Sequence, residues 1–266
     1  MLKKIPFRGS DLVYETRGSG KAVMLLHGFT EDRRIWEPII DKNESKYQWI
    51  IPDLPGSGES AFNSSLKSIS DFSELINCIL ENENIPALIL IGHSMGGYIS
   101  LAFAEKYPEK IHGLGLFHSS SYPDSEEKKE SRDKNIRFIR NHDPVLFVEQ
   151  AIPGLFSDSF KTEHPVEIRK LIDRYANFRR ESLVQYLDAM KNRLATTDVL
   201  LSITKPVLFI MGEEDKAVPI KDSLEQCHLP RISYIHILTR TAHMGMIENS
   251  SLCNSFVDRF LSVIPV

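Results

Sequence analysis

The sequence predicts an α/β fold, in which a doubly wound, mostly parallel sheet carries a helical insertion. Short apolar runs at residues 23–26, 47–51, 88–91 and 207–211 alternate with helical patterns. Runs that are apolar throughout suit strands buried on both faces, as in a parallel sheet covered by helices. The alternation of strands and helices indicates right-handed βαβ units, which build a doubly wound sheet.

Three more segments, residues 12–16, 111–117 and 233–238, are strand candidates. Two others are amphipathic helices. Residues 72–80 and 253–264 place apolar side chains at the i, i+3, i+4, i+7 spacing of a buried helix face. That spacing makes Cys253 a core residue.

The alternation stops between residues 119 and 200, where helical patterns and many aromatic residues occur without a good strand. We expect a core formed by residues 1–118 and 201–266. Residues 119–200 would form a helical cap over the carboxyl edge of the sheet. The alternative is that the alternation continues through a strand that the pattern does not reveal. The insertion has as many acidic as basic residues, so it indicates no strongly anionic substrate.

Composition restricts the class of protein. The 266 residues suit one large domain, and the net charge of −4 gives no electrostatic case for nucleic acid or an anionic membrane. No apolar run reaches the length of a membrane span, and no signal-peptide core follows the N-terminal lysines. Three widely spaced cysteines suggest reduced thiols and no zinc site. We therefore expect a soluble, cytoplasmic protein, whose oligomeric state the sequence does not determine.

Residues 92–96 read Gly-His-Ser-Met-Gly, the G-x-S-x-G pattern, between an apolar strand and a helix-compatible run. A sharp strand-to-helix turn requires glycines and presents the central serine, Ser94, at its tip. The N-terminus of the following helix supplies N–H dipoles for developing negative charge. Ser94 is therefore the candidate nucleophile, although a glycine-rich turn with a capping serine would share the pattern.

A serine hydroxyl needs a general base, and the base needs a carboxylate that orients it. His243 lies after the last predicted strand, in a loop at the expected carboxyl edge of the sheet, and is the candidate base. Asp215 follows the strand at 207–211 and is the candidate acid, with Glu213 and Glu214 as rivals in the same loop. His27 and His93 adjoin glycines and are interpreted as loop supports.

An oxyanion hole requires two backbone N–H donors. The N–H of Met95, which follows the nucleophile, is one candidate, and the N–H of Phe29, in the loop after the strand at 23–26, is the other. The glycine-containing loop at residues 53–60 resembles half of a nucleotide-binding loop, but it lacks the third glycine and no Walker pattern occurs. It is interpreted as a structural turn in which Asp53 accepts hydrogen bonds from loop backbone.

Taken together, these motifs resemble the α/β-hydrolase superfamily, with a serine nucleophile, a cap and an esterase-like site. The resemblance covers the catalytic frame in the family's order of Ser94, Asp215 and His243. The motifs are His27-Gly28-Phe29, Asp53-Leu54-Pro55-Gly56-x-Gly58-x-Ser60, Gly92-His93-Ser94-Met95-Gly96-Gly97, Gly212-x-x-Asp215-x-x-Val218-Pro219 and Ala242-His243. Ser94 excludes the branches with an aspartate or cysteine nucleophile. Tyr98 stands where the menaquinone-pathway lyase of this frame has arginine.

The resemblance implies cleavage of an ester or related acyl bond through an acyl-enzyme, with no cofactor and no metal. The aromatic residues of the insertion suggest a small, largely apolar substrate. Candidates for the pocket lining are His118, Phe147, Phe156, Tyr186 and Met244. Alternatives are a lyase or cofactor-free perhydrolase on the same frame, a slowly turning-over ligand-binding protein, and a nucleotide-dependent α/β protein.

Overall fold

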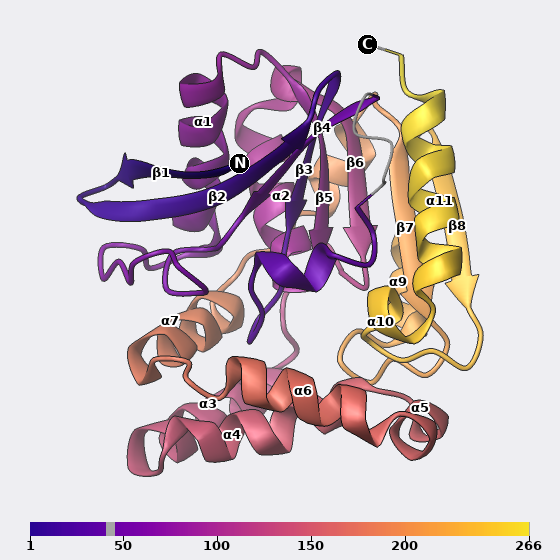
Figure 1. The fold of residues 1–266 in the computed structure, drawn as a ribbon. Coiled ribbons are helices and arrows are strands. Elements are labelled where there is room, and N and C mark those ends of the chain that lie inside the picture. The colour runs from indigo at the N-terminus through magenta and orange to yellow at the C-terminus, as the bar shows by residue number, and fades with distance from the viewer. Residues whose placement is uncertain (41–45, 266) are drawn as a thin grey trace.

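The computed structural model describes residues 1–40 and 46–265, and it contains one eight-stranded sheet (Figure 1). The strand order is β1-β2-β4-β3-β5-β6-β7-β8, and every neighbouring pair from β4 to β8 is parallel. The strands are β1 (Leu2–Phe7), β2 (Ser10–Gly18), β3 (Lys21–Leu26), β4 (Tyr47–Pro52), β5 (Leu88–His93), β6 (Ile111–Phe117), β7 (Val207–Gly212) and β8 (Ser233–Leu238). The predicted fold class is confirmed.

The chain begins with a β-hairpin, of which the sequence predicted the second strand (residues 12–16 within β2) but not β1. Strand β1 pairs antiparallel with β2, and β2 pairs antiparallel with β4. The two residues that join β1 to β2, Arg8 and Gly9, both have positive φ, at 47° and 83°. Such a two-residue turn matches the twist of paired strands. The Arg8-Gly9 dipeptide, which lies between two short apolar segments, is the feature of the sequence that indicates this turn.

Helices cover both faces of the sheet, and alternate strand residues face opposite layers. Met24 and Leu26 of β3 pack with α1 (Ile69–Glu83) and α2 (Met95–Lys106). Val23 and Leu25 pack in a second apolar cluster, to which α11 (Ser250–Val263) contributes. Since both faces of the central strands are buried, their continuous apolar runs are explained. Cys253 lies fully buried in α11, as predicted, and all three cysteines are free.

The chain between β6 and β7 forms the helices α3 (Glu126–Asn141), α4 (Pro144–Ala151), α5 (Asp158–Glu163), α6 (Pro165–Tyr175), α7 (Arg180–Lys191) and α8 (Thr197–Ser202). Of these, α3 to α7 lie beyond the carboxyl ends of the parallel strands (Figure 1), whereas α8 packs beside α2. The division into a core of residues 1–118 and 201–266 and a cap of residues 119–200 stays a prediction. Two further helices, α9 (Ile220–Gln226) and α10 (Gly245–Glu248), flank β8 in the chain, and short 3₁₀ turns occur at Arg33–Trp36, Pro108–Lys110 and Ile152–Leu155. Within the described ranges, no helix is both long and apolar enough to cross a bilayer.

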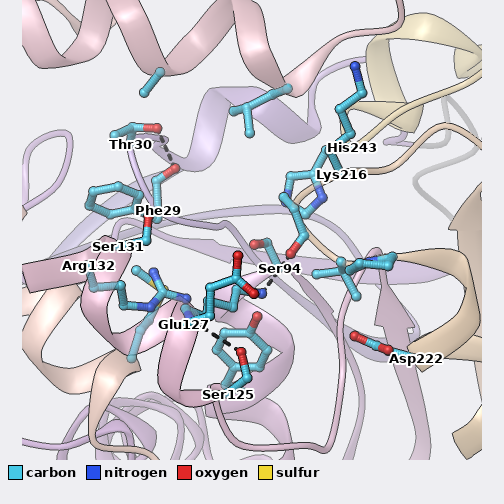
Figure 2. Close-up of a pocket in the computed structure, with 18 of the residues that line it drawn as sticks. Phe29, Thr30, Ser94, Ser125, Glu127, Ser131, Arg132, Lys216, Asp222 and His243 are labelled. Carbon is cyan, nitrogen blue, oxygen red and sulfur yellow. Dashed lines mark hydrogen bonds between the residues drawn. The ribbon is translucent and has the colours of Figure 1, made fainter. Parts of the chain in front are cut away.

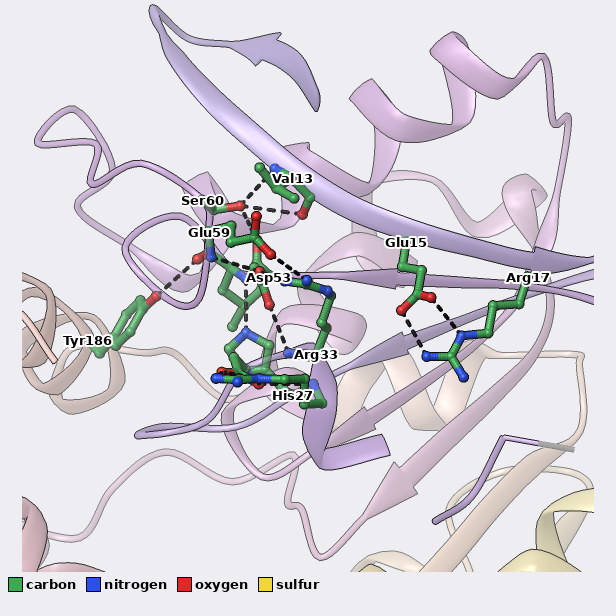
Figure 3. Close-up of polar contacts among 12 residues, drawn as sticks. Val13, Glu15, Arg17, His27, Arg33, Asp53, Glu59, Ser60 and Tyr186 are labelled. Atoms are coloured by element: carbon green, nitrogen blue, oxygen red, sulfur yellow. Dashed lines mark hydrogen bonds and ion pairs between the residues drawn. The ribbon is translucent and has the colours of Figure 1, made fainter. Parts of the chain in front are cut away.

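The loop after β4 is organised by Asp53, as the sequence reading proposed (Figure 3). Its carboxylate accepts hydrogen bonds from the Arg33 N–H at 2.8 Å and from the Glu59 N–H at 2.9 Å. The Arg33 guanidinium also pairs with Asp53, so the charge of the fully buried carboxylate is compensated. Nearby, His27 Nε2 accepts the Leu54 N–H at 2.9 Å and thereby ties the loop after β3 to the loop after β4.

Candidate active site

Ser94 lies at the junction of β5 and α2 in a backbone conformation that is unusual for a residue with a side chain. Its φ is 50° and its ψ is −116°. Close packing enforces the turn, since a Cβ at Gly92 would lie 2.3 Å from the Gly96 carbonyl carbon. A Cβ at Gly96 would lie 2.4 Å from the Leu26 carbonyl oxygen. Glycine at position 92 therefore lets β5 approach the start of α2, and glycine at position 96 lets α2 approach β3. Residues in a strained conformation like that of Ser94 cluster at functional sites.

Asp215 and His243 meet in the loops that follow β7 and β8. The two side chains are buried, and His243 Nδ1–H donates to Asp215 Oδ2 at 2.8 Å. Asp215 Oδ1 accepts the N–H groups of Ala217 and Val218 at 2.8 and 2.9 Å. Burial by itself would raise the pKa of Asp215, but His243 and the hydrogen bonds to the carboxylate hold that pKa well below its usual value. Asp215 therefore stays ionised and directs the lone pair of His243 Nε2 away from itself.

A second histidine shares the same carboxylate oxygen, which sequence reasoning did not foresee. His118 Nδ1–H donates to Asp215 Oδ2 at 3.0 Å, and its Nε2 has no partner among the described residues. Burial lowers the pKa of His118 to about 4, against the opposing effect of Asp215. His118 is therefore neutral, and its φ of 47° aims the ring toward the carboxylate.

The same three side chains could ligate one cation, because one ligand atom from each of His118, Asp215 and His243 lies within 4.8 Å of the others. Both Nδ1 atoms and Oδ2 are already paired in hydrogen bonds. These hydrogen bonds account for the closeness of the three groups.

Neutral, buried His118 should make the protein sensitive to acid. Since the unfolded histidine has a pKa of about 6.5, the unfolded state binds more protons between pH 6.5 and pH 4, and stability falls as the pH falls. From pH 6.5 to pH 5 the loss attributable to His118 should be about 2 kcal/mol. His118→Asn keeps an N–H donor for Asp215 and tolerates positive φ, but it does not titrate.

Urea unfolding at pH 6.5 and pH 5 measures this difference. The wild-type protein should lose about 2 kcal/mol more stability than His118→Asn over that interval. Asp215 contributes little there, because its unfolded pKa of about 3.9 lies below the interval. Equal losses for the two proteins would show that His118 is not held neutral.

Glu31 and His93 form a buried ion pair behind the site. His93 Nδ1 lies 3.0 Å from the Glu31 carboxylate, which also accepts the Gly28 N–H at 2.6 Å. Burial opposes charge on both partners, but their attraction outweighs it, lowering the pKa of Glu31 and raising that of His93. His93 Nε2–H donates to the His243 carbonyl oxygen at 3.0 Å. The pair thus joins the loop after β3 to the loop of His243. Sequence reasoning foresaw His93 as a support but missed Glu31.

A cavity of about 600 Å³ opens beside Ser94 and His243 (Figure 2). The loops after β3 and β7, the N-terminal half of α3 and the elbow form its walls. Its lining residues are Phe29, Thr30, Glu31, Ser94, Tyr98, Ser125, Glu127, Lys128, Ser131, Arg132, Ala151, Leu155, Met190, Lys216, Ala217, Val218, Pro219, Asp222 and His243. The wall contributed by α3 is polar and charged, unlike the aromatic lining suggested by the sequence.

None of the five expected pocket residues lines this cavity. His118 is turned toward Asp215 by its positive φ, and Met244 is buried in the apolar cluster beneath α11. Tyr186 is also buried. Its hydroxyl is hydrogen-bonded to Ser57 Oγ at 2.8 Å and donates to the Pro55 carbonyl oxygen at 2.9 Å, so it is directed at the loop after β4.

The two phenylalanines among those candidates are packing residues: Phe147 joins the insertion to the loop after β3, and Phe156 packs within the insertion. Phe147 packs against Phe29, with ring centroids 5.8 Å apart, and both the Phe147 and Phe156 side chains are buried. Phe156 stacks on Phe160 at 5.2 Å. Aromatic spacing in the sequence therefore marked core packing, because a helix face turned to a neighbouring helix and one turned to a cavity have the same period.

The two expected oxyanion donors come from the start of α2 and from the loop after β3. Met95 begins α2, so its N–H has no acceptor within the helix. Phe29 follows Gly28 in the loop after β3, and its ring lines the cavity. Within residues 1–40 and 46–265, the Phe29 N–H donates to no protein group. Both donors thus remain available to a ligand.

Comparison with known proteins shows the family. Residues 21–250 match the model of the α/β hydrolase fold, and the chain belongs to this family of enzymes. The uncharacterized hydrolase YugF of Bacillus subtilis is 26% identical over 98% of this chain and 97% of its own. The pimeloyl-[acyl-carrier protein] methyl ester esterase of Legionella pneumophila is 24% identical over 93% of this chain and 98% of its own. A thermophilic esterase from Thermogutta terrifontis, solved with malate bound, has a TM-score of 0.92 and 26% identity, with both chains fully covered.

Proposed function

We propose that this enzyme hydrolyses an ester of a small substrate through an acyl-enzyme on Ser94. One observation carries the proposal. Ser94, in its strained turn, shares a cavity with His243, whose Nδ1–H is bonded to buried, ionised Asp215. The esterases similar in sequence and structure support the same type of bond.

The chemistry follows from the tautomer of His243. Because Nδ1–H donates to Asp215, Nε2 carries the lone pair and accepts the proton of Ser94 Oγ. The oxygen then attacks the ester carbonyl, and the N–H groups of Phe29 and Met95 stabilise the oxyanion. Protonated His243 returns its proton to the departing alcohol.

Deacylation repeats these steps with water. His243 Nε2 takes a proton from water as the water oxygen attacks the acyl-enzyme, and the collapse of the intermediate returns Ser94 Oγ with that proton. Asp215 remains ionised throughout and stabilises the imidazolium. No cofactor enters the scheme.

Covalent labelling tests the nucleophile. An organophosphonate should react with Ser94 and not with Ser125 or Ser131, which line the same cavity from α3 and its N-cap and not from the elbow. Peptide mapping by mass spectrometry identifies the adduct, and His243→Gln should slow its formation strongly. A folded, active protein whose adduct maps elsewhere would contradict the assignment.

Product analysis separates hydrolysis from other reactions of the frame. In ¹⁸O-labelled water, the released acid should carry one solvent oxygen and appear in equal amount with the alcohol. A lyase leaves no solvent oxygen in the product, and a perhydrolase needs peroxide. Absence of solvent oxygen in the acid would therefore overturn the hydrolytic scheme.

A further inference from the structure

We propose that the cavity selects esters that carry a second, free carboxylate, and that Arg132 of α3 binds this carboxylate. The inference rests on the proposed function for the ester bond and adds the class of substrate. It is carried by three observations: one edge of the Arg132 guanidinium has no acceptor among the described residues, positive charge exceeds negative charge around Asp124, and the Arg132 side chain is largely buried.

Arg132 has one edge in use and one edge free. Its Nε and Nη2 atoms both donate to Asp124, so this carboxylate occupies the side-on edge of the guanidinium. The end-on edge, formed by Nη1 and the outer N–H of Nη2, has no acceptor among the residues that the structure describes. Two parallel N–H groups on one edge match the two oxygens of a carboxylate.

The cluster formed by Asp124, Lys128, Arg132 and Arg193 holds more positive than negative charge. Asp124 is buried, and it is approached by Arg132, by Arg193 at 2.6 Å and by Lys128 at 4.0 Å. Burial alone would raise the pKa of Asp124, but these arginines outweigh that effect and lower it, so the group is ionised. One carboxylate compensates one of three cations, and the cluster therefore attracts a further anion.

The other two cations of the cluster, Arg193 and Lys128, already interact with other groups of the protein. Arg193 lies over the Tyr98 ring, 4.0 Å from its centroid, and donates to the backbone carbonyl groups of Met190 and Tyr122. Lys128 Nζ donates to the Ala217 carbonyl oxygen at 2.7 Å. Arg132 is thus the member of the cluster that lines the cavity and still has a carboxylate-shaped edge to offer.

Arg132 is less exposed than three other charged residues that line the cavity. Its side chain is 12% exposed, that of Lys128 is 35% exposed, and Glu127 and Lys216 are exposed. Glu31 in the same lining is buried, but its charge is compensated by His93. Figure 2 shows Arg132 and Ser94 bordering the same cavity from α3 and from the elbow. Water and salt screen the exposed charges more than a buried one. We therefore expect Arg132 to be the main attraction for an anion in the cavity, because Glu31 is already paired with His93 and Glu127 is exposed to solvent.

The substrate class that fits is the half-ester of a short dicarboxylic acid, with the ester carbonyl at Ser94 and the free carboxylate at Arg132. The test compares monomethyl succinate, glutarate, adipate and pimelate with methyl esters whose far end is a carboxamide of equal length. Hydrogen bonds to charged groups predict a preference for the carboxylate of about 10- to 100-fold in kcat/KM at the best length.

Arg132→Gln should remove that preference, so that carboxylate and carboxamide esters of equal length react with similar kcat/KM, while Arg132→Lys should keep part of the preference. Lys129→Gln removes one charge from the same helix outside the cavity and should behave as wild type. Free glutarate should slow organophosphonate labelling of the wild type and not of Arg132→Gln.

The outcomes separate this inference from the proposed function. If Ser94 is labelled and both ester series react equally in the wild type, the carboxylate site is wrong and the hydrolase stands. If Arg132→Gln lowers kcat/KM equally for both ester series and slows the labelling of Ser94, Arg132 only supports the fold. Arg132→Lys then shows whether a positive charge at this position restores the activity. If Ser94 is not labelled at all, the proposed function fails first.

Discussion

Replacing Ser94 with alanine should lower kcat for ester hydrolysis by about 10⁴-fold or more and leave the protein folded. Loss of the nucleophile in a serine protease triad costs about 10⁶-fold, and the remaining rate comes from the oxyanion donors and from binding. The Phe29 and Met95 N–H groups and the cavity are unchanged in Ser94→Ala, so binding of a product acid should persist. Steady-state kinetics and calorimetric titration measure the two effects.

A second substitution at the same position, Ser94→Gly, separates the loss of the hydroxyl from the strain of the backbone. Ser94→Gly removes the hydroxyl and also suits a φ of 50°, whereas Ser94→Ala keeps a Cβ in that conformation. Relief of such strain is worth about 1–3 kcal/mol, so Ser94→Gly should be more stable to urea than Ser94→Ala. If Ser94→Ala retains a tenth or more of the activity, Ser94 is not the nucleophile, whatever the stabilities.

Asp215→Asn should lower kcat by about 10⁴-fold, the loss seen for this change in a serine protease triad. The carboxylate accepts four hydrogen bonds, two from backbone N–H groups at Oδ1 and two from histidines at Oδ2. If the asparagine oxygen keeps the backbone donors, its NH₂ group faces His118 and His243. Both rings must then give up an Nδ1–H donor, and His243 loses the lone pair at Nε2.

The control is Glu214→Gln, one residue away and exposed. It should retain kcat within about twofold, because a screened surface carboxylate has little effect on a buried site. A pH profile of kcat separates loss of the base from loss of the fold. Should Glu214→Gln prove as damaging as Asp215→Asn, the orienting acid would have been assigned to the wrong residue.

Much of the fold was predictable because its central strands are buried on both faces. The runs at 23–26, 88–91 and 207–211 have no polar interruption, and each coincides with a strand of the parallel part of the sheet. The hairpin strand β1 was missed, because Leu2–Phe7 mixes lysines with apolar residues and its pairing depends on the turn at Arg8 and Gly9.

The sequence alone determined which candidate catalytic residues lie at the carboxyl ends of the strands. Ser94, Asp215 and His243 each follow a recognisable strand, and parallel strands end at one edge, so their convergence needed no knowledge of side-chain packing. The bond between His243 and Asp215 agrees with that inference.

Only the tertiary structure decided what surrounds those groups. His118, Glu31 and Arg132 acquire their partners from segments 97, 62 and 8 residues away, and neither a period nor a motif encodes such pairs. The insertion shows the same limit. Its aromatic side chains pack inward against one another and the core, while α3 turns a charged face to the cavity. Helical periodicity predicts that one face of a helix is buried, but the orientation in which the helix packs decides whether that face contacts protein or substrate.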